Sequence, residues 1–258
     1  MERKIIYYDD EINDDFAGTG IKSCEVDGRY KYQHKSLLWR VLSGFLYYVI
    51  AIPIVFIIER VIFGVRFVNA RALRECPESV FLYGNHTGWY DAFTPCLLSF
   101  PRRNCTVVSS DAVSIFGLRW AVEMLGGVPV PTEMSGMRSF TDTVAERHKG
   151  ANITIYPEAH IWPYFTGVRD FPDASFTYPA RLGGPVFAFF TAYTKPRGFF
   201  SLFRRADVTV YVSDPIYADE GLTPREARRN IRDKVYSFMK EMSEKSDYAV
   251  YEYRRREE

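Results

Sequence analysis

A histidine and an aspartate five residues apart are the side chains of this chain best placed to do chemistry together. His86 and Asp91 lie in residues 84–91 (Gly-Asn-His-Thr-Gly-Trp-Tyr-Asp), between a strand-like apolar run at 79–83 and the opening of a helix at 92–98. An imidazole titrates near neutral pH and can take a proton from a hydroxyl, while a carboxylate can hold one ring nitrogen and stabilise the imidazolium. The pair is therefore a candidate general base with its partner. The alternative for an isolated motif is that His86 caps the helix and Asp91 is a solvated surface residue.

A second polar group follows another predicted strand. Residues 153–156 (Ile-Thr-Ile-Tyr) run into Pro157, Glu158, Ala159 and His160. In α/β sheets the chemistry collects at the carboxyl ends of strands, so we expect Glu158 to lie near His86.

A metal-dependent hydrolase is an alternative, because these side chains supply the nitrogen and oxygen ligands that zinc or iron takes. Its four ligands would be His86, Asp91, Glu158 and His160. The spacing of His86 and Asp91 is not the i, i+4 spacing that aligns two ligands on a helix, so we predict no metal and no cofactor.

Composition narrows the class of protein. The 258 residues are 47% hydrophobic, which is ample for a large core, and the net charge of +1 gives no support for nucleic-acid binding. Aromatic residues reach 16%, and Tyr and Trp favour membrane interfaces. The four cysteines show no metal-site spacing, which favours reduced thiols in a cytosolic compartment.

Residues 41–58 contain no charged side chain. Eighteen residues lie at the lower edge of what spans a bilayer, and basic residues on both flanks give no orientation by the positive-inside rule. We therefore predict membrane attachment by a helix, or by a helix pair broken at Pro53; a buried core helix is the alternative. Separately from this segment, we expect the active site on the cytoplasmic face.

The domain prediction has four parts. It comprises a polar N-terminal segment at 1–36, a membrane-associated helical segment at 37–62, an α/β domain at 63–250 and a charged tail at 251–258.

Strands and helices alternate along the α/β domain. Further strands are expected at 63–68, 105–109, 184–190 and 206–212, and helices at 111–125, 141–149 and after Thr223, where a capping box with Glu226 opens the last helix. This order predicts an α/β fold with a mixed central sheet flanked by helices, plus an N-terminal membrane-associated helix or helix hairpin.

The motifs together resemble the glycerolipid acyltransferase superfamily, whose best-known members are the 1-acyl-sn-glycerol-3-phosphate (lysophosphatidic acid) acyltransferases. The family pattern is Asn-His-x4-Asp, then Gly-x-(I/V)-x-V-x-R, then Phe-Pro-Glu-Gly-Thr-Arg, then Val-Pro-(V/I). In this chain the four blocks fall at 85–91, 126–131, 155–158 and 184–186, and the resemblance covers roughly residues 41–217.

The resemblance implies acyl transfer from an acyl thioester, either acyl-CoA or acyl-carrier protein, to a hydroxyl of a lysophospholipid in phospholipid synthesis. His86 resembles the catalytic base, Asp91 its partner, and Glu158 the acid that helps to hold the acceptor. Membrane lipids are the implied partners.

This chain departs from the family pattern where the family grips phosphate. Ala159-His160-Ile161 stands in place of Gly-Thr-Arg, and the second block has no arginine at 131–132. We expect Arg138 and Arg169 to replace the missing cations, since phosphate favours the guanidinium fork; ordinary surface arginines are the alternative. His160 is expected to join Glu158 in binding the acceptor. A membrane-attached lipid-binding protein without turnover is the alternative that the lost arginines leave open.

Overall fold

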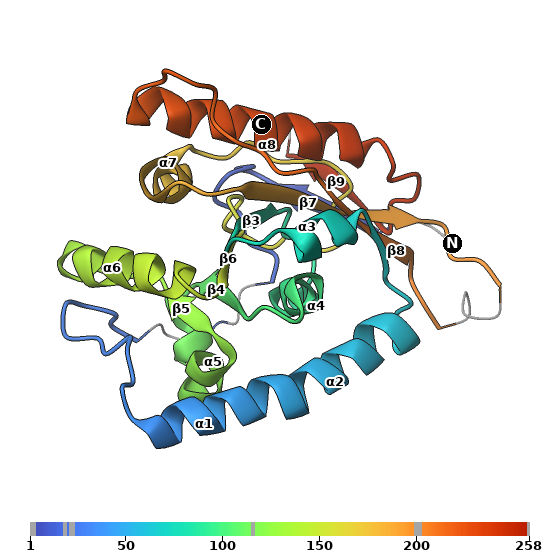
Figure 1. The fold of residues 1–258 in the computed structure, drawn as a ribbon. Coiled ribbons are helices and arrows are strands. Elements are labelled where there is room, and N and C mark those ends of the chain that lie inside the picture. Colours follow the sequence, from blue (N-terminus) through green and yellow to red (C-terminus); the bar gives the residue numbers. More distant parts are fainter. Residues whose placement is uncertain (1–3, 18–19, 21–23, 115–116, 199–202, 257–258) are drawn as a thin grey trace.

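The computed structural model describes residues 4–17, 20, 24–114, 117–198 and 203–256. Its centre is a seven-stranded sheet in the order β2-β8-β7-β3-β6-β4-β5, in which every neighbouring pair is parallel except the antiparallel pair β7–β8. The strands of this sheet are β2 (Arg66–Val68), β3 (Phe81–Gly84), β4 (Asn104–Val108), β5 (Gly127–Pro129), β6 (Asn152–Ile155), β7 (Val186–Thr194) and β8 (Asp207–Val212). The mixed α/β sheet flanked by helices that the sequence predicts is therefore confirmed (Figure 1).

Both faces of the sheet are buried, which explains why β3 is apolar throughout. Phe81 and Tyr83 point into a core shared with three helices, whereas Val80 and Leu82 point into a second core on the opposite face. The helices of the first face are α6 (Met137–His148), α7 (Thr177–Leu182) and α8 (Pro224–Ser243); those of the second are α3 (Ala70–Glu75) and α4 (Thr94–Ser99).

Helix α8 covers the first face of the sheet, and it begins as the sequence predicts. The Thr223 hydroxyl accepts from the Glu226 amide while the Glu226 carboxylate accepts from the Thr223 amide, so the predicted capping box is confirmed. Ile231, Val235 and Met239 of its apolar face are buried against the sheet.

The apolar segment is one continuous helix from Leu37 to Ile62, long and apolar enough to cross a membrane by length and composition. It consists of α1 (Leu37–Phe45) and α2 (Ile52–Phe56) with π-helical turns at Leu46–Ala51 and Ile57–Ile62. Pro53 does not break it into a pair, because it lies at the start of α2 directly after a wider π turn.

This helix packs along the second face of the domain through residues spaced by four. Ser43 donates to the Met124 carbonyl (2.7 Å), the Tyr47 hydroxyl accepts from the Asn104 amide (2.9 Å), and Glu59 accepts from the Thr94 hydroxyl (2.9 Å). In a regular α-helix a spacing of four drifts by about 40° per step, since there are 3.6 residues per turn. The two π turns underwind the helix and keep this stripe against the domain.

Two predicted elements differ in the structure. The helix expected at 111–125 is a 3-10 turn at Ser110–Val113 followed by α5 (Arg119–Leu125), and residues 115–116 between them lie outside the described part. The tail, which the sequence suggests is only charged, contains β9 (Tyr251–Arg255).

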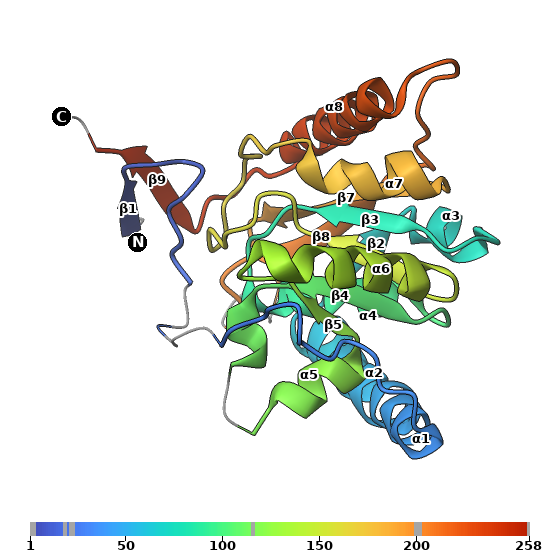
Figure 2. The same cartoon turned by 90° about the vertical axis from the view of Figure 1, so that its left-hand side faces the viewer.

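The two ends of the chain pair with each other. β1 (Lys4–Tyr8) and β9 form a parallel two-stranded ribbon that stands beside the main sheet (Figure 2). Its Tyr253 ring stacks on Trp162 with centroids 4.9 Å apart, and the Trp162 indole donates to the Asp14 carbonyl (2.8 Å). The ribbon therefore packs on the loop after β6. The domain boundaries stay a prediction.

Replacing Tyr47 with Phe should lower the free energy of unfolding by about 1–3 kcal/mol, because the buried Asn104 amide loses its acceptor. Urea denaturation in detergent micelles measures the change. The control is Tyr48→Phe, since Tyr48 is exposed on the same helix; equal effects of the two substitutions would contradict the anchoring role of Tyr47.

Candidate active site

The two candidate chemical groups come from neighbouring parallel strands. His86 follows β3 and Glu158 follows β6, and β3 pairs with β6 in parallel register. Parallel neighbours end at the same edge of a sheet, so both side chains arrive at the carboxyl edge. The structure thus places Glu158 beside the His86–Asp91 pair, as the sequence predicts.

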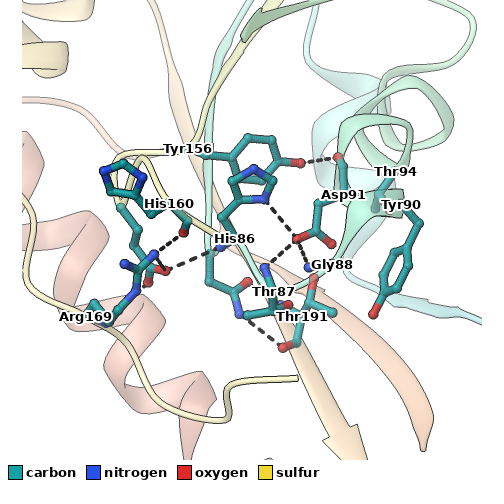
Figure 3. Close-up of polar contacts among 12 residues, drawn as sticks. His86, Thr87, Gly88, Tyr90, Asp91, Thr94, Tyr156, His160, Arg169 and Thr191 are labelled. Atoms are coloured by element: carbon teal, nitrogen blue, oxygen red, sulfur yellow. Dashed lines mark hydrogen bonds and ion pairs between the residues drawn. The ribbon is translucent and has the colours of Figure 1, made fainter. Parts of the chain in front are cut away.

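Asp91 is the centre of the hydrogen bonds in the loop. Its Oδ2 accepts from the Thr87 amide (2.6 Å), the Gly88 amide (2.8 Å) and His86 Nδ1 (3.2 Å) (Figure 3). Asp91 is 1% exposed, so the alternative of a solvated surface residue is wrong. Since the Thr87 and Gly88 amides already donate to Asp91, neither is available to an oxyanion.

The His86 imidazole is held by a stacking contact as well as by its hydrogen bond to Asp91. The imidazole stacks on Tyr156 with centroids 4.4 Å apart and an interplanar angle of 19°, and the Tyr156 hydroxyl donates to the Asp91 carbonyl. A carboxylate only accepts, so the contact with Asp91 places the ring proton on Nδ1 and the lone pair on Nε2. The His86 side chain is 16% exposed, which leaves Nε2 as the atom that can meet a substrate.

The backbone of His86 is fixed from the opposite side. Its amide donates to Glu158 Oε2 (3.4 Å), and its carbonyl accepts from the Trp162 amide (3.1 Å). The turn after β6 therefore holds the main chain of the candidate base, while Asp91 holds its ring.

Glu158 forms a buried ion pair with Arg169. The Arg169 guanidinium donates to Glu158 Oε2 (3.2 Å) and its amide donates to Oε1 (3.3 Å). Burial raises the pKa of Glu158 above its ordinary value, and the charge of Arg169 opposes that shift.

The other predicted acceptor residues differ in their exposure to solvent. His160 is half-exposed and 3.7 Å from the Asp15 carboxylate. Arg138 is exposed near the start of α6, two strands along the sheet from β6. Arg169 is 1% exposed. Binding of an acceptor by these residues stays a prediction.

Three further residues of the site, Asn85, Thr87 and Tyr193, have no predicted role from the sequence. Asn85 donates to the Thr191 carbonyl (3.2 Å) and accepts from the Thr191 amide (2.8 Å), so its side chain extends the pairing of β3 with β7 beyond Gly84. The Tyr193 hydroxyl lies 2.7 Å from both the Thr87 and the Tyr90 hydroxyls. Only the position of Asn85 next to His86 gave a signal; Tyr193 lies in a distant strand.

Two cavities differ in their position relative to His86. An apolar one of about 250 Å³ lies between the apolar helix and Tyr90 and Phe93, which flank Asp91 and Ala92. A larger polar one of about 510 Å³, lined by Arg102 and His148 among others, opens at the amino-terminal edge of the sheet. The larger cavity is remote from the candidate base, whereas the smaller one is lined by residues that directly precede and closely follow Asp91 in the chain.

Within the described part of the chain, no group of three or more histidine, cysteine, aspartate or glutamate side chains is arranged to hold a metal ion. Glu158 approaches the main chain of His86 rather than its ring.

Comparison with known proteins yields a structural neighbour. The chain matches no family model and no curated protein sequence. It is similar in structure to the 1-acyl-sn-glycerophosphate (LPA) acyltransferase PlsC from Thermotoga maritima, with a TM-score of 0.49, 18% sequence identity, and coverage of 72% of this chain and 73% of that one. A similarity of this degree does not establish a family or an activity for the chain.

Replacing Asn85 with Ala should lower the free energy of unfolding by about 2–4 kcal/mol, since the buried polar groups of Thr191 lose a partner on each side. Thermal or urea unfolding gives the change. Asn230→Ala is the control, because Asn230 contacts Asp219 at the surface of α8 and should cost within about 0.5 kcal/mol. A loss of stability for Asn85→Ala no larger than that for Asn230→Ala would show that the bonds of Asn85 to Thr191 do not stabilise the fold.

Proposed function

We propose that this protein is a membrane-attached O-acyltransferase. It transfers a fatty acyl group from an acyl thioester, acyl-CoA or acyl-carrier protein, to a hydroxyl of a lysophospholipid such as lysophosphatidic acid, in phospholipid synthesis. The observation that carries the proposal is the contact of His86 Nδ1 with Asp91 at the carboxyl edge of the sheet, which leaves Nε2 for a substrate proton. The order of the Asn-His-x4-Asp and Pro-Glu motifs supports the same chemistry.

The proposed reaction needs one proton to move twice. Nε2 of His86 takes the proton of the acceptor hydroxyl while the oxygen attacks the thioester carbonyl carbon. The carbon–sulfur bond then breaks, and the departing thiolate receives the proton from the imidazolium. Asp91 stabilises the imidazolium between these two steps because its carboxylate is fixed against Nδ1.

The small apolar cavity supports the acyl part of the proposal. Ile50, Ala51 and Ile54 of the apolar helix form one wall, and Tyr90 and Phe93 form the other. An alkyl chain in this cavity would lose its contact with water, and its carboxyl end would lie near the segment that carries Asp91.

Membrane attachment is proposed to be parallel to the surface rather than spanning. Polar contacts bind the helix to the domain from Ser43 to Glu59, and only 17% of its most apolar 18-residue stretch is buried. The helix runs along the bottom of Figure 1, and many of its exposed side chains are apolar. They include Leu37, Leu38, Val41, Phe45, Val49, Phe56, Ile57 and Val61, and α5 adds Trp120. Such a surface suits immersion in one leaflet, proposed to be the cytoplasmic one.

Acceptor binding is proposed for the polar residues around the pair. Glu158 lies against the His86 amide, His160 is half-exposed on the same loop, and Arg138 is exposed at the same edge of the sheet. An arginine fork suits a phosphate group of a lysophospholipid, which favours Arg138 as a contact for the headgroup.

Replacing His86 with Ala should reduce acyl transfer to a lysolipid by about 10²- to 10⁴-fold, because the general base is lost. Thiol release and ester formation, followed together, measure the rate. The variant should still float with anionic liposomes, since the apolar helix is unchanged.

His148→Gln is the matched control, because His148 lies at the opposite edge of the sheet and should retain wild-type activity. If the wild type transfers nothing to any lysolipid, and His86→Ala alters only lipid binding, the protein is a binding protein and the catalytic proposal fails.

Replacing Ala51 with Phe should shift the donor preference toward shorter acyl chains, because the larger side chain fills part of the apolar cavity. Competition between acyl thioesters of different lengths measures the shift. Val49→Phe is the control, since Val49 is exposed on the same helix and does not line the cavity. Identical chain profiles for Ala51→Phe and the wild type would place the acyl chain elsewhere.

A further inference from the structure

Arg169 is surrounded by protein on every side. It is 1% exposed, although it is one of the largest side chains of the chain. Its guanidinium donates to the Glu158 carboxylate and to the carbonyls of Glu11 and His160, and it lies over the Trp162 ring at 5.0 Å from the centroid. In Figure 3 Arg169 lies on one side of His86, and Asp91 lies on the other.

These contacts leave Arg169 no direct path to an acceptor phosphate. A phosphate would have to displace the Glu158 carboxylate from a buried ion pair, and removing one partner of such a pair leaves an uncompensated buried charge. The Arg169 guanidinium is therefore bonded to the loop after β6 and to the N-terminal segment.

Glu158 transmits the position of Arg169 to the candidate base. Oε2 of Glu158 accepts from both Arg169 and the His86 amide, so one oxygen atom joins the guanidinium to the main chain of His86. The Arg169 amide holds the other oxygen. Arg169 therefore fixes the orientation of the Glu158 carboxylate that accepts from the His86 amide.

We propose that Arg169 is a positioning residue for acyl transfer: it fixes Glu158, and through Glu158 it fixes the backbone of His86, rather than binding the phosphate of the acceptor. This inference rests on the proposed function and replaces the direct role in acceptor binding that the sequence suggests. The fork geometry of a guanidinium lets one side chain reach a carboxylate and two carbonyls at once, which a lysine ammonium does not do in a fixed plane.

Steady-state kinetics of Arg169→Met and Arg169→Lys test the proposal on two acceptors, lysophosphatidic acid and monoacylglycerol. We expect kcat to fall at least tenfold in Arg169→Met for whichever of them the wild type uses, with KM within about twofold, and Arg169→Lys to recover only part of the loss. The control is Arg228→Met. Arg228 lies on α8 away from His86 and pairs with Asp173, so this variant should retain wild-type kcat. A KM that rises more than tenfold for lysophosphatidic acid alone, with kcat unchanged, would show a phosphate ligand and overturn the proposal.

Hydrogen exchange of the His86 amide gives a second readout that does not depend on turnover. We expect exchange at this amide to become at least tenfold faster in Arg169→Met, and to stay unchanged in Arg228→Met. Arg169→Met leaves the Glu158 carboxylate buried without its partner, and the double variant Glu158→Gln with Arg169→Met removes that charge. The double variant should therefore fold as stably as the wild type, while its His86 amide still exchanges faster.

The two measurements separate the two proposals. A wild type that transfers no acyl group, with faster His86 exchange in Arg169→Met, rejects the enzyme but keeps the link from Arg169 to His86. Unchanged exchange in Arg169→Met rejects the positioning role, whatever the activity.

Discussion

A single carboxylate oxygen holds the loop on which the candidate chemistry depends. Asp91 Oδ2 accepts three N–H groups, two from the main chain at Thr87 and Gly88 and one from the His86 ring. An anion inside a protein is stable only when such donors surround it, so the fold of the loop and the charge of Asp91 require each other. The same bonds orient His86, and the tautomer of its ring follows from them.

The sheet brings the second half of the site to this loop. β3 and β6 are parallel neighbours, so Glu158 reaches the amide of His86 although 72 residues separate them in the sequence. Asn85 bonds the end of β3 to β7, and the Tyr156 ring stacks on the imidazole. His86 is thus held at its ring, its amide and its carbonyl, which reduces the reorganisation that proton transfer would require.

The apolar helix also supports this region, because it contacts the segment that follows the loop at residues 85–91. Glu59 accepts from Thr94, the first residue of α4, and Tyr90 and Phe93 line a cavity with the helix. A surface immersed in a leaflet would in this arrangement lie close to the candidate base. In the proposed reaction, the lysolipid acceptor would then reach His86 from the leaflet.

The sequence predicted the features that depend on local patterns. The apolar run, the capping box at Thr223 and the alternation of strands and helices all appear in the structure. Periodicity could not reveal that π turns carry the helix past Pro53, because that depends on packing against the domain.

Two other contacts between distant segments were not predictable from the sequence. Pairing of β1 with β9 joins the two ends of the chain, and the ion pair of Arg169 with Glu158 forms only when the loop after β6 folds back. Arg169 suggested a phosphate ligand because the sequence shows that the residue is an arginine but does not show that it is buried. Tyr193 gave no signal, because nothing in the pattern of β7 distinguishes it from a core residue.

The most direct test of the account is the time course of thiol release from an acyl thioester, with and without an acceptor hydroxyl. Direct transfer through His86 predicts that thiol appears only with a lysolipid, in equal amount to the ester formed, and not with an analogue in which hydrogen replaces that hydroxyl. A stoichiometric burst of thiol in the absence of any acceptor would show an acyl-enzyme intermediate and contradict the role given to His86.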